Sequence, residues 1–385
     1  MTKTESLSGR AVLMLAHCAG MVDMVALPVW IGTLVSQYKL DPQQAGGLVT
    51  LFLLGAVVSS VFFAPRFNRM SGRWASAIGF GLAAIAFALL ATTRDFAMMA
   101  VLHGLAGAAA GCGLSFTHGT IGRSVNPHRM FALVGVALGI FAVAFFAMVP
   151  KLIAASGGEV LFNIFAAVMV VATVASAIAF PVLHVKEATA SEAASASRKR
   201  LPPAVWFAVF GIACMALVQS MIFSFLERIG MDRGFGLEAV SGVLIALGLI
   251  NLLPSPLAAF LQRRWPAHNV VLVGPMAQAA LAMTMAFSAG FAPYAFAAGL
   301  FAGVMIFTHN FAFGLLAALD PSGRAVAATP AMLMVGAAIG PVLGGTLVKT
   351  FGYPSLGIAA ALVGTMAILS FWRVRPAATS VAAFA

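Results

Sequence analysis

Residues 11–37 read AVLMLAHCAGMVDMVALPVWIGTLVSQ, and Asp23 is the only charged side chain among them. A helix needs about 20 predominantly apolar residues to cross the hydrocarbon core of a bilayer. This stretch therefore predicts a membrane-spanning helix. It is too long for the apolar region of a signal peptide and lacks a clear cleavage site, so we expect it to remain attached as the first span.

The composition extends this prediction to the whole chain. Of its 385 residues, 62% are hydrophobic and only 9% are charged, whereas soluble domains carry about 25% charged residues. The formal net charge is +11, but the basic residues lie in short loops, which favours lipid head groups over nucleic acid as partners. The three cysteines lie singly in apolar runs and predict buried thiols rather than a disulfide or metal site. This composition excludes a soluble enzyme.

Apolar runs separated by loop signals predict an all-α membrane protein with twelve transmembrane helices. The predicted spans are 11–37, 44–65, 74–93, 96–121, 130–154, 160–183, 204–227, 237–261, 269–289, 293–318, 325–349 and 354–373.

A polar segment, 184–203, separates the first six spans from the last six. It predicts a cytoplasmic linker between an N-terminal six-helix bundle, 1–183, and a C-terminal six-helix bundle, 204–385. An offset of 195 residues brings seven pairs of like residues together, five of them Gly on Gly, which indicates a duplicated unit. The pairs are Gly47/Gly242, Arg69/Arg264, Gly79/Gly274, Gly104/Gly299, Gly119/Gly314, Arg129/Arg324 and Gly157/Gly352.

Twelve spans place both termini on the same side of the membrane. Of the 22 Lys and Arg residues, 16 fall on the side of the termini and six on the other. Cytoplasmic loops carry an excess of Lys and Arg, so this distribution predicts cytoplasmic termini. Compact loops and the absence of any Asn-x-Ser/Thr acceptor fit a bacterial inner membrane.

Three short stretches resemble motifs of a known family. Residues 64–73 read APRFNRMSGR, in the loop where the major facilitator superfamily usually has Gly-x-x-x-Asp-Arg-x-Gly-Arg-Arg. Arg69, Gly72 and Arg73 keep this pattern, although the first Gly is absent, Asn68 replaces the acid and one extra residue precedes Gly72. A merely basic, lipid-facing loop is the alternative.

The resemblance covers the whole chain. It implies two pseudo-symmetric six-helix bundles, alternating access to a central site, and conformational roles for Arg69, Gly72 and Arg73. In span four the family often carries an Arg followed by Gly and small residues, a pattern linked with proton handling. Here His103 stands before the small residues of 107–111. The resemblance therefore implies a proton-coupling role for His103, with a neutral histidine hydrogen-bonded inside the bundle as the alternative.

Span eleven contains a Gly-x-x-x-Gly-Pro-x-x-Gly-Gly pattern that includes Gly340 and Pro341. In the family this is the antiporter motif when it occurs in span five. The positions 195 residues earlier do not contain it, so it does not establish efflux here. We expect conformational roles for Gly340 and Pro341, with a packing groove and a kink as the simpler interpretation.

Asp23 lies about 13 residues into the first span, roughly 20 Å along a helix at 1.5 Å per residue. An ionised Asp near the bilayer centre costs about 2.5 to 3.5 kcal/mol, so such residues normally face the bundle interior or water. Burial favours the protonated form of a carboxyl group. We therefore predict that Asp23 binds and releases a coupling proton, with a structural tie to polar neighbours as the alternative.

Several uncharged polar residues also lie deep in the spans and suggest a partly polar cavity. For each one, an interhelical hydrogen bond is the alternative to solute binding. The predicted substrate-binding residues are His17, Gln219, Asn251, His309 and Asn310; Gln278 and Thr308 lie at similar depth. We interpret Glu227 and Arg228 as an ion pair at the outer rim.

The sequence thus predicts a secondary transporter for a small organic solute, coupled to protons and surrounded by lipid. We favour efflux by antiport over uptake by symport, and a transporter over a receptor or channel-like protein. No phosphate-binding loop, metal-binding pair or catalytic triad appears. We expect no enzymatic activity, no metal and no cofactor. We also expect the protein to be a monomer.

Overall fold

The computed structural model describes residues 4, 6–63, 66, 69–181, 201–320 and 329–374, with the backbone alone for 127, 128 and 329–332. The described residues form helices joined by short connections and contain no β-strand. Residues 184–200 of the predicted linker, 184–203, lie outside the described residues. The helices before it form what we call the first half, and those after it form the second half.

In the first half, the helices are α1 (Leu7–Gly20), α2 (Val22–Ser36), α3 (Pro42–Phe63), α4 (Gly72–Leu90), α5 (Phe96–Gly122), α6 (Pro127–Ser156) and α7 (Glu159–Ala179). In the second half, they are α9 (Pro203–Asp232), α10 (Leu237–Ile250), α11 (Pro254–Leu261), α12 (Ala267–Phe287), α13 (Phe291–Leu319), α15 (Thr329–Phe351) and α16 (Pro354–Trp372).

These helices confirm the prediction of twelve spans. Twelve helical segments are long and apolar enough to cross a membrane, and each corresponds to one predicted span. Two of the spans are divided: α1 and α2 together form the first, and α10 and α11 together form the eighth. Pro254 begins α11 after residues 251–253, a position that suits proline because the first residue of a helix needs no N–H donor within the helix. The sequence did not predict the break in the first span, where Met21 separates the two helices.

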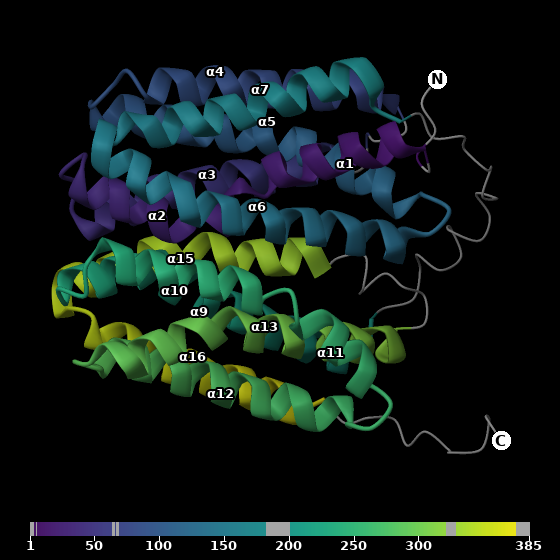
Figure 1. Ribbon diagram of the computed structural model, residues 1–385. Coiled ribbons are helices and arrows are strands. Elements are labelled where there is room, and N and C mark those ends of the chain that lie inside the picture. Colours follow the sequence, from purple (N-terminus) through teal and green to yellow (C-terminus); the bar gives the residue numbers. More distant parts are fainter. Residues whose placement is uncertain are drawn as a thin grey trace.

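The two halves lie one above the other in Figure 1, with the helix axes running roughly along the same direction. We call the end at which α1 begins and α16 ends the terminal end, and the opposite end the distal end. The halves pack through α3 on α15, α2 on α9 and α6 on α10. By contrast α1 packs on α5, α6 and α7 of its own half, and α11 packs on α13 of its own half. Close contacts between the halves, such as Gly32 with Glu227, Gly46 with Pro341 and Gly345 with Pro42, lie at the distal end and toward the middle of these helices.

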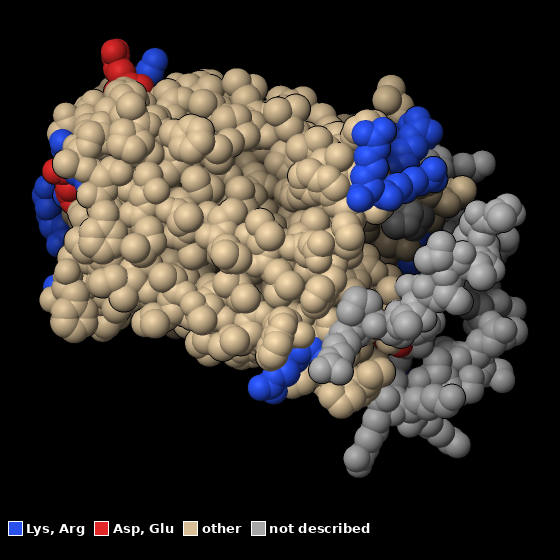
Figure 2. All heavy atoms as spheres, turned by 90° about the horizontal axis from the view of Figure 1, so that it is seen from below, with Lys and Arg blue, Asp and Glu red and all other residues tan. Residues whose placement is uncertain are grey.

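The surface agrees with a membrane protein. Figure 2 shows charged side chains gathered at the two ends, with a band of other residues between them. Large apolar side chains such as Leu82, Ile85 and Leu362 are exposed. In water, such exposed apolar side chains would favour aggregation, whereas in a membrane they contact lipid tails. The cysteines Cys18, Cys112 and Cys214 are buried and unpaired, as predicted.

Candidate functional site

The broken first span places Asp23 near the middle of the bundle. α1 ends at Gly20, and Asp23 lies in the first turn of α2. The backbone N–H groups of Asp23 and Met24 hydrogen-bond to its carboxylate. Because the start of a helix carries partial positive charge, this position stabilises an ionised carboxylate.

The Asp23 side chain is partly exposed and has no opposite charge beside it. Ion pairs among the described residues join Arg94 to Glu159, Arg228 to Asp232 and Lys349 to Asp41, and none of these includes Asp23. In secondary transporters, discontinuous helices commonly form the sites for substrates and coupling ions. Asp23 is thus partly exposed and lies at mid-span, at the break between α1 and α2.

His17 and His118 form a hydrogen-bonded pair between α1 and α5. The distance from Nδ1 of His17 to Nε2 of His118 is 3.0 Å, and the ring centroids are 5.1 Å apart. Phe131 of α6 lies against the His118 ring. One neutral imidazole can donate and the other accept, so the pair needs no charge. The sequence prediction included His17 and missed His118, although a second histidine in span four was a visible signal.

His103 lies in the core of the first half. Its side chain is fully buried, and Nδ1 lies 2.7 Å from the carbonyl oxygen of Met99. The ring stacks on Trp30 at 5.5 Å and meets the edge of Phe162 at 5.7 Å. Surroundings of this kind favour the alternative of a neutral histidine that packs within the bundle.

In the second half, Gln219 lies at the contact between α9 and α12. Nε2 of Gln278 donates to Oε1 of Gln219 at 3.3 Å and to the carbonyl oxygen of Met215 at 3.2 Å. Gln278 is buried, whereas Gln219 remains partly exposed. Gln219 therefore has an accessible side and a fixed orientation, as a solute-binding residue requires.

Asn251 and Asn310 lie at the break in the eighth span, and His309 precedes Asn310 in α13. Asn251 caps α10, and its Oδ1 is buried without a hydrogen-bond partner among the described residues. His309 is buried, hydrogen-bonds to the backbone of Ile212 and stacks on Phe313. Asn310 is exposed and donates to Ser255 of α11 at 3.3 Å. Asn251 and Asn310 are thus better placed for a solute than His309.

The glycines of span eleven are packing positions. A Cβ atom at Gly336 or Gly340 would collide with α9, one at Gly344 would be tightly packed against α9, and one at Gly345 would meet the backbone of α3 at Pro42. Gly46 of α3 likewise lies directly against the carbonyl group of Pro341. Small residues allow helix backbones to approach closely. This supports the packing interpretation of the motif and places α15 at the boundary between the halves.

Two hydroxyl groups complete the hydrogen bonds around Pro341. Proline has no N–H, so the carbonyl of residue 337, four residues earlier, loses its helical donor. Ser220 of α9 donates to that carbonyl at 2.7 Å. From the other side, Thr50 of α3 donates to the carbonyl oxygen of Ala338 at 2.8 Å and accepts from the N–H of Val342 at 3.2 Å. In span eleven, side-chain hydroxyl groups from both halves therefore take part in the backbone hydrogen bonding around Pro341.

The loop before α4 contains Arg69, Gly72 and Arg73, while residues 64, 65, 67 and 68 of the motif lie outside the described residues. Nε of Arg73 donates to the carbonyl oxygen of Ala177 at 2.6 Å, near the end of α7. A cation is favourable at a helix C-terminus. Arg69 is exposed, and Gly72 lies against the ring of Phe180. Arg73 and Gly72 thus connect the start of α4 to the last span of the same half.

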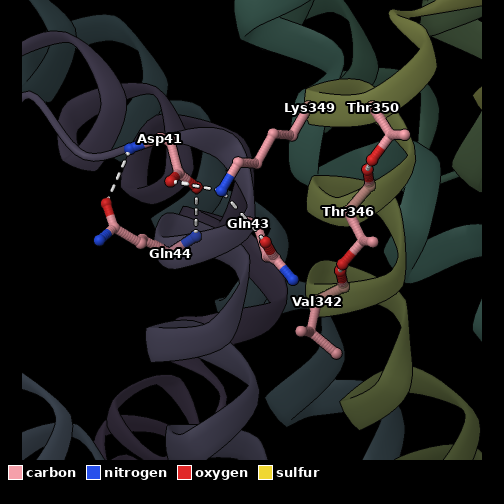
Figure 3. Close-up of polar contacts among 7 residues, drawn as sticks. All are labelled: Asp41, Gln43, Gln44, Val342, Thr346, Lys349 and Thr350. Atoms are coloured by element: carbon pink, nitrogen blue, oxygen red, sulfur yellow. Dashed lines mark hydrogen bonds and ion pairs between the residues drawn. The ribbon is translucent and has the colours of Figure 1, made fainter.

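A polar latch that the sequence did not predict joins the halves at the distal end (Figure 3). Nζ of Lys349 in α15 lies 2.9 Å from Oδ2 of Asp41 and 3.3 Å from Oε1 of Gln43. Asp41 also accepts from the backbone N–H of Gln44 at 2.9 Å, so it caps α3. We call Lys349, Asp41 and Gln43 the distal latch.

The interpretation of Glu227 and Arg228 as an ion pair is wrong. Arg228 pairs with Asp232, one turn later on the same helix, and Tyr353 donates to Asp232 as well. Residues four apart share a helix face, whereas adjacent residues point in different directions. Glu227 therefore points elsewhere.

Two large hollows, of about 670 and 620 Å³, lie on the flanks of the bundle. The first is lined mainly by α4 and α5, including Trp74, and the second by α11 to α13, including Trp265. Their walls are almost wholly apolar and contain none of the predicted site residues. Grooves of this character suit lipid tails rather than a polar solute.

Comparison with known proteins identifies the family. A sequence profile described as Major Facilitator Superfamily matches residues 12–322. No curated protein sequence matches the chain. The structure is similar to "Crystal structure of nucleoside transporter NupG", with a TM-score of 0.71 and 15% sequence identity, covering 96% of this chain and 97% of that one. Since the profile spans most of the chain, and the neighbour shares the fold, the protein belongs to the Major Facilitator Superfamily and is a membrane transporter, not an enzyme.

Proposed function

We propose that the protein moves a small organic solute across a bacterial inner membrane by alternating access, coupled to protons through Asp23. The observation that carries this proposal is the position of Asp23, which is partly exposed at the break of the first span without an opposite charge among the described side chains. Its protonation removes a charge that is costly in hydrocarbon. A carboxyl group that gains and loses a proton as the site opens to each side would link proton flow to the transport cycle.

The distribution of basic residues supports a cytoplasmic location for the terminal end. The halves meet through the distal end and the middle of the bundle, and the distal latch joins them there. With this orientation, the arrangement corresponds to a transporter closed to the outside. We propose four residues for solute contact: Asn251, Asn310, Gln219 and His17. Each is polar and lies on a span that borders either the contact between the two halves or a break in a helix.

The decisive experiment is counterflow and proton-driven transport in proteoliposomes. Solutes would first be found by a thermal-shift screen of metabolites and drugs, with nucleosides included because NupG, a structural neighbour, is a nucleoside transporter. We expect Asp23→Asn to abolish proton-driven accumulation and to retain solute exchange. Asp95→Asn is the matched control, since Asp95 caps α5 at the distal surface and Asn caps equally well. Unchanged dependence of Asp23→Asn on the pH gradient would remove Asp23 from the mechanism.

The same preparation distinguishes the alternatives. Efflux by antiport, which we favour, predicts that solute and protons move in opposite directions, whereas uptake by symport predicts the same direction. A receptor would show binding without exchange of labelled for unlabelled solute. A channel-like protein would let the labelled solute equilibrate across the membrane, and unlabelled solute on the opposite side would not accelerate its uptake.

A further inference from the structure

Glu227 is an acidic residue at the contact between the two halves. It lies in α9, five residues before the distal end of that helix, and α9 packs on α2 of the first half. Its carboxylate lies against Gly32 of α2, so closely that a Cβ atom at residue 32 would collide with Oε2. Gly32 is four residues before the end of α2, so this contact belongs to the distal closure.

Among the described residues no basic side chain forms an ion pair with Glu227, although the charge of the adjacent Arg228 acts on it. Its Oε2 is buried and has no hydrogen-bond partner among the described residues. Arg228 is committed to Asp232, which also receives the hydroxyl of Tyr353. The hydroxyl of Tyr294 in α13, which interacts electrostatically with Glu227, donates to the carbonyl oxygen of Leu226.

The remaining helices packed on α9 supply no counter-charge. On α2 the only titratable residue is Asp23, at the opposite end, and α15 offers Lys349, which binds Asp41. Glu238 at the start of α10 is exposed. α16 has no titratable residue, and the one on α12, His268, lies near the terminal end.

Burying an unpaired carboxylate is costly, and burying a neutral carboxyl group is much less so. The closed distal end is therefore compatible with protonated Glu227 and opposes ionised Glu227. When α2 and α9 separate at this end, water reaches the group and the ionised form becomes favourable. Closure and protonation are thus linked: whatever favours one favours the other.

We propose that Glu227 is a second proton-binding site, which closes the distal gate when it is protonated and favours opening when it is ionised. This deepens the proposed function and rests on its proton coupling, but it concerns a different group and step. Asp23 would couple protons to the solute at mid-span, whereas Glu227 would set how readily the outer gate closes at a given pH.

The test measures the gate without any solute. Spin labels on Thr92→Cys and Ala289→Cys, exposed distal positions after α4 and α12, report the separation of the halves when Cys18, Cys112 and Cys214 are replaced by Ala. In lipid nanodiscs we expect the long-distance population to grow between about pH 5.5 and pH 8.5, a range in which a buried carboxyl can titrate. Glu227→Gln should keep the short distance throughout, because the amide stays neutral.

Two further variants make the result specific. Glu238→Gln, at an exposed acid of the same half, should retain the pH response of the parent. Gly32→Ala should favour the long distance at every pH, because the added carbon displaces the Glu227 carboxyl group. A pH response that persists in Glu227→Gln, or a parent protein without any pH response, would overturn the proposal. Neither result affects the outcome of the transport assay with Asp23→Asn. The proposals for Glu227 and for Asp23 can therefore be refuted independently.

Discussion

Thr50 and Val342 belong to different halves of the chain, yet the hydroxyl oxygen of Thr50 lies 3.2 Å from the backbone nitrogen of Val342. The same hydroxyl donates to the carbonyl of Ala338. In a regular helix the N–H of residue 342 pairs with the carbonyl of residue 338. The side chain of one half thus takes part in the backbone hydrogen bonding of the other, one residue beyond Pro341.

We expect Thr50→Val, which keeps the shape and removes the hydroxyl, to weaken the closed distal end. Interhelical hydrogen bonds in membranes are worth about 0.6 kcal/mol on average and up to about 1.7. The ratio of closed to open molecules should therefore fall roughly 3- to 20-fold, as measured by the labelled pair at residues 92 and 289. Ser220→Ala is the control, because it removes the other hydroxyl at Pro341 within a single half. An equal shift in both variants would contradict a specific role for Thr50.

The distal latch should act independently of pH over the physiological range. Partial burial opposes ionisation of Asp41, but the backbone N–H of Gln44 and the Lys349 ammonium group outweigh it and hold the pKa of Asp41 below its usual value. A lowered pKa in the folded protein means that the contribution is complete above the unfolded pKa, about 3.9, and is lost only as the pH falls through the folded value. The latch therefore stays ionised where Glu227 is proposed to titrate.

Accordingly, Lys349→Gln should shift the labelled pair toward the long distance by the same small amount at every pH tested. The two side chains are 47% and 33% exposed, and partly exposed pairs contribute about 0.2 to 1 kcal/mol. Exchange of the two charges in Lys349→Asp with Asp41→Lys should recover part of the loss. A Lys349→Gln effect that disappears at the acidic end of the range would show that Asp41 is protonated there and that the latch itself titrates.

Adjacent glycines in α3 give a matched pair for helix packing. A Cβ at Gly46 would collide with the carbonyl group of Pro341, whereas one at Gly47 would meet nothing within 4 Å. We expect Gly46→Ala to force α3 and α15 apart, at a cost of about 1 to 3 kcal/mol for overpacking, and Gly47→Ala to be neutral or slightly stabilising. Thermal midpoints of the purified proteins in detergent compare the two. Equal midpoints would mean that the helices adjust without cost.

We expect the hydrogen bond between His17 and His118 to stabilise the contact between α1 and α5. His17 is also a candidate for solute contact. If the hydrogen bond matters, a double-mutant cycle with His17→Ala and His118→Ala should give a coupling of at least about 0.5 kcal/mol in stability. An effect on the KM for the solute from His17→Ala alone, without such coupling, would instead assign His17 to binding.

The sequence by itself determined the number and positions of the spans. A bilayer offers no hydrogen-bond partners, so each crossing must be a long apolar helix, and that requirement is visible in the residues themselves. It also singled out Asp23, because a charge is conspicuous in an apolar run. The basic loops and the glycine motif of span eleven were visible in the same way, although the motif's partners in α9 and α3 were not.

Only the tertiary structure decided which polar groups meet. Apolar periodicity says little about how membrane helices are rotated, because lipid is as apolar as the interior. The break at Met21, the partner of His17, the bond between Thr50 and Val342, and the contact of Glu227 with Gly32 all depend on backbone approach between segments distant in sequence. Such contacts are set by packing in three dimensions. For this reason the sequence suggested an ion pair between the adjacent residues Glu227 and Arg228, whereas in the structure Arg228 pairs with Asp232.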